Sequence, residues 1–135
     1  KEITLVYIDD VVSKFIDIIQ GVHTNQTDCY IKPEYQITLG QLADTIKSFR
    51  NVRNSLLSED VGTGLVRALY ATYVSYLPPE DFSYEIPIYA DDRGVFSEII
   101  KNTKSGQISF FTAHPGVTRG GHYHHSKTEK FLVIN

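Results

Sequence analysis

The sequence predicts an α+β fold in which a helical first part is followed by a part made of strands. Apolar residues recur at helical spacing before the proline pair Pro78–Pro79, and they alternate with a period of two after it. A proline pair cannot continue a helix, because proline lacks the backbone N–H group. The change of period places a boundary near residue 85, with one domain over residues 1–85 and a second over residues 86–135.

The first two elements are expected to be a strand and a helix. Residues 2–7 alternate in the way that is typical of a strand whose two faces differ. Asp9 or Asp10 is expected to cap the helix that follows, because a carboxylate accepts hydrogen bonds from the free N–H groups of the first turn. Gly21 suits a left-handed C-terminal cap. Residues 22–34 are polar and show neither period, so we expect a loop.

Two further helices and three strands complete the expected elements. Thr38 and Gln41 form a capping-box pattern at the start of a helix over residues 38–52. A third helix is expected from about Thr63 as far as the prolines, because one side of this stretch is apolar. The strands are then expected over residues 84–89, 94–101 and 107–114, with turns at 91–92 and 104–106.

Composition and charge exclude several classes of protein. The chain has 135 residues, with 13 lysines and arginines against 16 aspartates and glutamates, and its formal net charge is −3. No basic cluster is present, which argues against a nucleic-acid partner. No apolar run approaches the roughly 20 residues of a membrane-spanning helix. Cys29 is the only cysteine, so no internal disulfide can form. These features predict a cytoplasmic protein with no membrane or nucleic-acid partner.

The two ends of the sequence predict an excerpt from a longer protein. The chain contains no methionine and opens on Lys1, just before a strand. At the other end, residues 130–135 resemble an apolar strand that stops without a turn or a partner. We expect two incomplete domains, and a last strand that is frayed, exchanged with a neighbouring chain or covered in an oligomer.

Four of the five histidines lie within one window of twelve residues: His114, His122, His124 and His125. In a strand, His122 and His124 would point to the same side, and His125 would point away. Glu129 follows closely enough to add a carboxylate to this pair. Two imidazoles and a carboxylate form a facial triad that suits zinc, iron, manganese or nickel. We expect His125 to be a surface or supporting residue and His114 to be structural.

The spacing around this triad resembles the first motif of the cupin superfamily. Five residues separate Gly116 from His122-x-His124, and four residues separate that pair from Glu129. This resemblance implies a small β-barrel, of which the chain holds the first half, and a further histidine ligand that this sequence lacks. A solvated histidine-rich loop or a purification tag is the alternative, but a tag consists of consecutive histidines.

The first part of the chain resembles the end of extended short-chain dehydrogenase/reductases. The segment Leu5–Val12 is similar to their YxxDDVV sequence, and Tyr35–Ala43 is similar to the start of a late helix. The same order of segments continues through Tyr73–Pro78, Asp81–Tyr84, Asp91–Gly94 and Gly121–Phe131. Together they resemble the bifunctional capsular polysaccharide and O-antigen enzymes of the UDP-N-acetyl-L-fucosamine pathway, in which a reductase is fused to a C-terminal cupin.

This resemblance implies two reactions on a UDP-2-acetamido-2,6-dideoxy-4-hexulose. The cupin part epimerises carbon 3, and the reductase part reduces the 4-keto group with NADPH to give UDP-2-acetamido-2,6-dideoxy-L-talose. His122, His124 and Glu129 are the expected ligands of zinc or another divalent metal. The catalytic residues stay unassigned, with His122 and Lys127 as candidates. Lys127 or Lys130 is a candidate for steering the nucleotide phosphates. A homodimer is the expected oligomer.

The reductase active site is expected to lie outside this chain. No GxxGxxG cofactor loop is present. The match of Tyr123 and Lys127 to the catalytic YxxxK pair overlaps an expected strand, whereas that pair requires a helix. We therefore expect NADPH to bind only in the parent protein and the isolated chain to be inactive as a reductase.

Two other function classes fit part of the pattern. One is a non-catalytic metal- or sugar-binding cupin module of a regulator, and the other is a cupin isomerase or oxygenase. A regulator would usually carry a basic recognition helix, but Lys47, Arg50 and Arg53 are too scattered on the second helix to contact bases.

Overall fold

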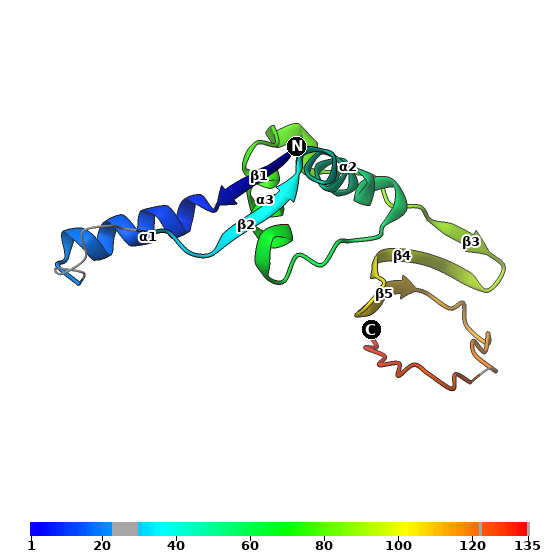
Figure 1. Cartoon of the computed structure of the whole chain (residues 1–135). Coiled ribbons are helices and arrows are strands. Elements are labelled where there is room, and N and C mark those ends of the chain that lie inside the picture. Colours follow the sequence, from blue (N-terminus) through cyan, green and yellow to red (C-terminus); the bar gives the residue numbers. More distant parts are fainter. Residues whose placement is uncertain (23–29, 122, 135) are drawn as a thin grey trace.

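The computed structural model describes residues 1–22, 30–121 and 123–134 and consists of helices and two small sheets (Figure 1). The elements are β1 Glu2–Val6, α1 Ile8–Ile19, β2 Glu34–Thr38, α2 Leu39–Ser55, α3 Gly64–Ser75, the 3₁₀ helix η1 Pro79–Phe82, β3 Tyr89–Asp91, β4 Gly94–Asn102 and β5 Gly106–Phe111. The mixture of helices and strands confirms the predicted fold at this coarse level. None of the helices within the described ranges is long and apolar enough to cross a bilayer.

The first sheet contains a strand that the sequence analysis missed. β1 pairs antiparallel with β2, with Glu2 opposite Thr38 and Val6 opposite Glu34. Glu34 had been predicted to belong to a loop, so that boundary is wrong, and residues 23–29 of the same predicted loop lie outside the described residues. β2 escapes prediction because it is short and runs directly into the cap of α2. Its Ile37 is buried, which shows that the strand contributes to the core.

Helix α1 begins two or three residues earlier than predicted. Its N-cap residue is Tyr7, while Asp9 and Asp10 lie in the first turn, so the prediction that either aspartate caps the helix is wrong. Their carboxylates still favour the helix, because the N-terminal end of its dipole is positive. The Asp9 carboxylate also accepts a hydrogen bond from Tyr7 and raises the pKa of that phenol. Gly21 has a φ of +74°, which confirms the predicted left-handed conformation at the C-terminal end.

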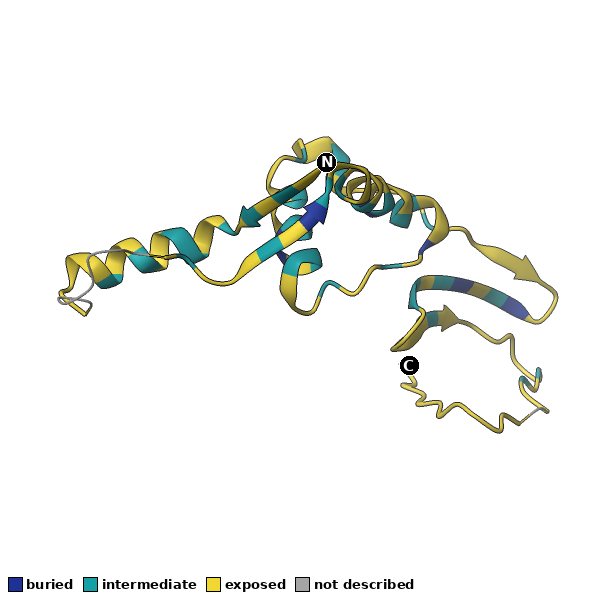
Figure 2. Ribbon diagram, viewed as in Figure 1, coloured by how far each residue is buried: buried dark blue, intermediate teal, exposed yellow. Residues whose placement is uncertain are grey.

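The core of the first part lies between α2 and α3 (Figure 2). The capping box is confirmed, since the Thr38 hydroxyl accepts from the Gln41 backbone N–H and the Gln41 side chain accepts from the Thr38 N–H. Phe49 on α2 is only 2% exposed, and its ring lies 5.1 Å from Tyr70 and 5.7 Å from Tyr73 on α3. Burial of these apolar faces holds the two helices together.

The second sheet has the order β3-β4-β5, and all its pairs are antiparallel. The predicted strand over residues 84–89 is wrong, because residues 84–88 are irregular and β3 begins at Tyr89. Pro87 cannot donate to a ladder, which explains the late start. β5 ends at Phe111, before the predicted residue 114, although Thr112 and His114 still donate backbone hydrogen bonds to Val95 and Arg93.

The C-terminal segment forms no strand among its described residues, 123–134. The strands predicted around His124 and over residues 130–135 are therefore wrong as far as the structure describes them. A strand needs a hydrogen-bonded neighbour, and no described strand pairs with this segment. Phe131 instead packs edge to face on Phe111 of β5, with ring centroids 6.3 Å apart.

A short parallel pairing joins the helices to the second sheet. β3 pairs with β4 only as far as Phe96, and Leu57 pairs with Lys101 further along β4. The Ser58 N–H donates to the Lys101 carbonyl, and the Lys101 N–H donates to the Leu56 carbonyl, each at 2.8 Å. We call this contact between residues 56–60 and 101–104 the joint.

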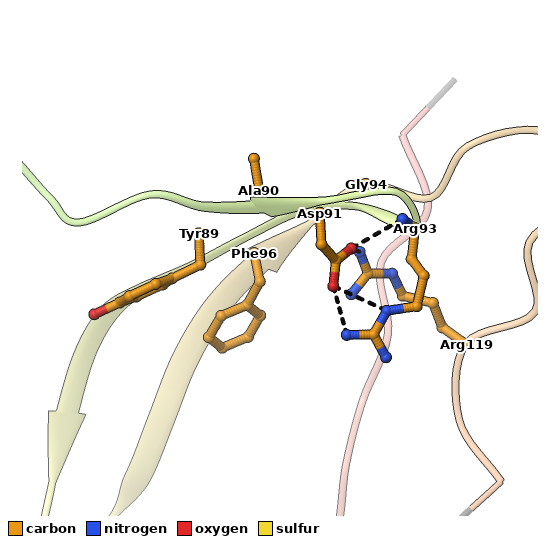
Figure 3. Close-up of a pocket in the computed structure, with 7 residues that line it drawn as sticks. All are labelled: Tyr89, Ala90, Asp91, Arg93, Gly94, Phe96 and Arg119. Atoms are coloured by element: carbon orange, nitrogen blue, oxygen red, sulfur yellow. Dashed lines mark hydrogen bonds and ion pairs between the residues drawn. The ribbon is translucent and has the colours of Figure 1, made fainter.

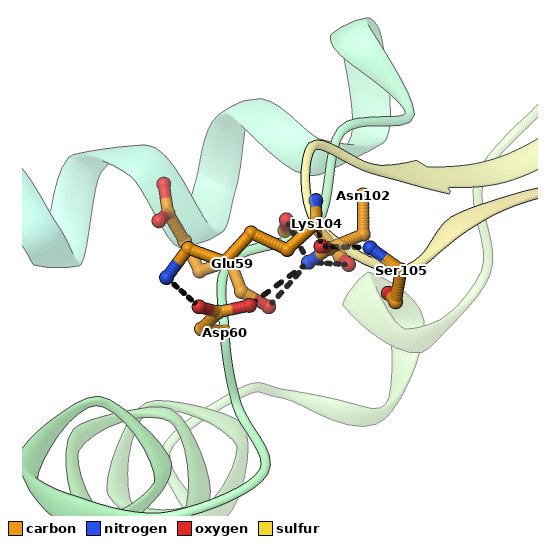
Figure 4. Close-up of polar contacts among 6 residues, drawn as sticks. Glu59, Asp60, Asn102, Lys104 and Ser105 are labelled. Atoms are coloured by element: carbon orange, nitrogen blue, oxygen red, sulfur yellow. Dashed lines mark hydrogen bonds and ion pairs between the residues drawn. The ribbon is translucent and has the colours of Figure 1, made fainter. Parts of the chain in front are cut away.

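Polar side chains reinforce the joint (Figure 4). The Asn102 amide donates to the Ser58 carbonyl at 3.0 Å, and its Oδ1 accepts from the Lys104 N–H at 2.8 Å. Lys104 also forms an ion pair with Asp60, and the ammonium lowers the pKa of the Asp60 carboxyl while the carboxylate raises the pKa of Lys104. Asn102 thus connects the chain after α2 to the turn between β4 and β5.

We predict that Asn102→Ala loosens the joint. Loss of these hydrogen bonds should lower the free energy of unfolding by about 1–2 kcal/mol, measured by urea denaturation. Amide hydrogen exchange at Ser58 and Lys101 should accelerate. The matched control is Asn51→Ala on the exposed surface of α2, which should keep or slightly raise stability because alanine favours a helix. Unchanged exchange at Ser58 and Lys101 in Asn102→Ala would contradict this role.

Candidate functional site

Two of the three predicted metal ligands lie side by side. The Nε2 atom of His124 is 3.3 Å from the Oε1 atom of Glu129, and the two side chains are 29% and 42% exposed. Residues 125 and 126 form a bend, so the chain turns back and brings the carboxylate to the imidazole. This proximity comes from the bend and does not require the strand that the sequence predicted.

The third predicted ligand, His122, lies outside the described residues. Within the described ranges, no group of three side chains able to hold a metal is found. The described pair fits a divalent metal, because two ligands at ~2.0–2.1 Å from a tetrahedral ion are about 3.4 Å apart. The donor set, an imidazole nitrogen and a carboxylate oxygen, is also one that zinc accepts.

The other residues singled out in this region have different surroundings. The Lys127 ammonium is 3.9 Å from Oε1 of Glu129, which brings a positive charge to the same carboxylate. The His125 ring packs edge to face on Tyr123, with centroids 5.1 Å apart. Lys130 is exposed. No helix is present over residues 123–127, so the Tyr123 and Lys127 pair lacks the helical setting that a dehydrogenase pair requires.

His114 has a structural backbone role. Its N–H donates to the Arg93 carbonyl at 3.1 Å, and its own carbonyl accepts from the Val117 N–H at 3.1 Å. These bonds hold the chain after β5 against the hairpin of β3 and β4 and then turn it towards Arg119.

A second candidate site, which the sequence analysis missed, is a pocket at this hairpin (Figure 3). The pocket has a volume of about 290 Å³ and is lined by Tyr89, Ala90, Asp91, Arg93, Gly94, Phe96 and Arg119. From the sequence, Asp91 is expected only in a turn and in one of the segments that carry the resemblance. Arg119 comes from a distant part of the chain, so its contribution could not be derived from local spacing.

Two ionic contacts shape the pocket. Asp91 accepts hydrogen bonds from the Arg93 backbone N–H and from the Arg93 Nε, each at 2.9 Å. These bonds lower the pKa of the Asp91 carboxyl and raise the pKa of the Arg93 guanidinium. The Arg119 guanidinium lies 3.9 Å from the same carboxylate and 5.6 Å from the centre of the Phe111 ring.

Gly94 fixes the hairpin that carries the pocket. Its φ of +132° disfavours any other residue, and a Cβ atom there would lie only 2.4 Å from the carbonyl oxygen of Thr112. The Thr112 side chain also accepts from the Val95 N–H at 3.0 Å. The glycine thus allows the chain after β5 to approach the start of β4 closely.

Comparison with known proteins gives a consistent class of relatives. Residues 89–135 match the family described as Polysaccharide biosynthesis C-terminal domain. Similar proteins are named as a sugar-nucleotide reductase and as a capsular polysaccharide protein. The sequence resemblance predicted proteins of this kind.

In particular, the chain is 59% identical to UDP-2-acetamido-2,6-beta-L-arabino-hexul-4-ose reductase of Pseudomonas aeruginosa, over 98% of this chain and 36% of that protein. It is also similar to two crystal structures of the capsular polysaccharide assembling protein CapF from Staphylococcus aureus. Both share 36% identity over 93% of this chain, with TM-scores of 0.82 and 0.83 and coverage of 34% and 37% of the CapF chains. The chain therefore spans about a third of the length of these relatives.

We predict that the contribution of Asp91 to stability disappears in acid. The carboxylate has a pKa below the unfolded value of about 3.9. Its stabilising effect is therefore complete above that value and is lost as the pH falls through the lower, folded pKa. Urea unfolding should show Asp91→Asn to be less stable than the wild type at pH 6, with a difference that shrinks below about pH 4.

Arg93→Gln provides the matched test, because it removes the partner of the same carboxylate. The double variant should then differ little from Asp91→Asn. If the stability difference between Asp91→Asn and the wild type stays constant or grows in acid, the assigned pairing of Asp91 with Arg93 is wrong.

Proposed function

We propose that the chain is part of a sugar-nucleotide enzyme of capsular polysaccharide synthesis, with a metal site formed by His122, His124 and Glu129. The observation that carries this proposal is the 3.3 Å approach of His124 Nε2 to Glu129 Oε1. The names of the P. aeruginosa reductase and of CapF support the substrate class, a UDP-linked keto sugar, and the pathway.

We propose epimerisation at carbon 3 of a UDP-2-acetamido-2,6-dideoxy-4-hexulose as the reaction of this site. A proton next to a ketone can be removed by a positioned base and returned on the other face. A divalent metal bound here would stabilise the negative charge that develops on the carbonyl oxygen. His124 and Glu129 would hold that ion, and Lys127 adds a positive charge beside Glu129. The base is unassigned: of the two catalytic candidates, His122 is already used as a metal ligand and has no lone pair left for the proton, which leaves Lys127.

A small-molecule inhibitor of a relative agrees with a metal site. One crystal structure of CapF, which has a TM-score of 0.83 to this chain, contains the inhibitor 3-isopropenyl-tropolone. A tropolone carries two adjacent oxygen atoms, and oxygen donors of this kind bind divalent metals. We therefore expect zinc or another divalent ion in the protein that carries this chain.

We further propose that residues 1–85 belong to the end of an extended short-chain reductase and residues 86–135 to the first half of a cupin barrel. The polysaccharide-biosynthesis family match, which begins at residue 89, supports a boundary in this region. In this proposal the remaining part of the protein binds NADPH and reduces the 4-keto group to give UDP-2-acetamido-2,6-dideoxy-L-talose. The whole protein acts in the cytoplasm as a homo-oligomer.

The test is solvent exchange at carbon 3, followed by NMR in heavy water. The full-length protein should incorporate deuterium from solvent into the keto sugar nucleotide without NADPH. His124→Gln should lose bound metal and reduce the exchange rate by roughly 100-fold or more, because loss even of a partner that only orients a metal ligand costs about 10–100-fold.

The adjacent His125→Gln is the matched control, because its ring packs on Tyr123 and not on Glu129. This variant should keep both metal and exchange. Metal binding without any exchange in the wild type would instead indicate a non-catalytic binding module. Full exchange in metal-free His124→Gln would contradict the proposed role of the metal site.

A further inference from the structure

The pocket between the β3–β4 hairpin and Arg119 combines charge with an aromatic wall. Tyr89 and Phe96 are direct partners in the β3–β4 register, so their side chains lie on the same face of the hairpin as Asp91 (Figure 3). The volume of about 290 Å³ is at the small end of the range for small-molecule sites. The pocket can therefore hold part of a ligand of nucleotide size.

The pocket has an excess of positive charge. Asp91 is paired with Arg93 through hydrogen bonds to both carboxylate oxygens, so these two charges compensate each other. Arg119 approaches Asp91 only to 3.9 Å, beyond hydrogen-bonding distance, and its charge remains in excess. Asp92 lies in the hairpin turn and does not line the pocket.

Arg119 is held in place and has an unused donor. Its side chain is only 23% exposed, and its guanidinium lies over the Phe111 ring, a favourable arrangement that fixes its orientation. The buried Nε has no hydrogen-bond acceptor within the described part of the chain. A buried charged donor without an acceptor is costly, and a ligand oxygen with negative charge would supply what is missing.

The aromatic wall suits a planar or ring-shaped group beside that anion. Tyr89 is 63% exposed and Phe96 is 36% exposed, so a ligand can cover both rings. Aromatic side chains stack on nucleobases of any sequence because every base presents a π face. Arginine guanidinium groups, in turn, bind phosphate oxygens through paired hydrogen bonds.

We propose that this pocket binds a nucleoside diphosphate, with Arg119 and Arg93 contacting the diphosphate and Tyr89 and Phe96 contacting the nucleoside. The naming of uridine diphosphate as this nucleotide rests on the proposed function. Arg119 stands three residues before His122, so the pocket adjoins the proposed metal site along the chain. The nucleotide would thereby anchor the substrate while its sugar reaches the metal ligands.

Calorimetry on the full-length protein with UDP, inorganic pyrophosphate and uridine tests this inference. Arg119→Gln should weaken UDP and pyrophosphate binding about tenfold or more, because charge-assisted bonds to phosphate are lost. Arg50→Gln, on the exposed surface of α2, is the matched control and should bind UDP as the wild type does. If another part of the protein also binds UDP, the isotherm has two steps and only one changes.

Tyr89→Ala separates a nucleotide site from a phosphate site. This exposed residue can be replaced without disturbing the core, and its loss should weaken UDP binding while leaving pyrophosphate binding unchanged. If Tyr89→Ala weakens UDP and pyrophosphate binding equally, or does not weaken UDP binding, the assignment of the pocket to a nucleotide is wrong. If Arg119→Gln binds UDP with the wild-type affinity in every step of the isotherm, the pocket is not a UDP site.

These outcomes are distinguishable from failure of the proposed function. UDP binding lost in Arg119→Gln would support the pocket even if no exchange occurred at carbon 3. Conversely, normal exchange together with unchanged UDP binding in Arg119→Gln would reject the pocket and leave the metal chemistry intact.

Discussion

The arrangement of this chain depends on the backbone pairing between residues 56–58 and β4. Helix α2 ends at Ser55, and its C-cap residue Leu56 is buried and has a left-handed φ of 56°. The backbone at residues 56 and 58 then forms two hydrogen bonds with Lys101. β3 pairs with the first three residues of β4, and Leu57 pairs with Lys101 near the other end of β4. The helices and the second sheet are therefore connected through β4, which also carries β5.

Both candidate sites are positioned from this sheet. The hairpin of β3 and β4 forms one wall of the pocket, and backbone bonds from Thr112 and His114 bring the following chain, with Arg119, to its other side. The segment that carries His124 and Glu129 is held at Phe131 by its contact with Phe111 of β5. The proposed cation site and the proposed anion site lie on neighbouring segments, and together they would suit a substrate that has a keto group at one end and a diphosphate at the other.

Local signals were sufficient to predict part of this structure. The capping box of Thr38 and Gln41 and the left-handed Gly21 follow from neighbouring residues, and both are confirmed. Local signals could not predict pairing between distant segments. β2 forms because β1 lies beside it, whereas residues 84–88 show apolar alternation but form no strand. Among the site residues, spacing grouped Glu129 with His124, whereas Arg119 in the pocket depends on a contact with the distant Asp91.

The proposed chemistry requires that His124 and Glu129 hold a divalent metal. X-ray absorption spectroscopy of the zinc-loaded full-length protein tests it most directly, because the spectrum reports the ligand atoms and their distances. We expect nitrogen and oxygen ligands at about 2.0–2.1 Å, including imidazole, with loss of one imidazole in His124→Gln. A zinc spectrum that is identical in the wild type and in His124→Gln would contradict a metal site that includes His124.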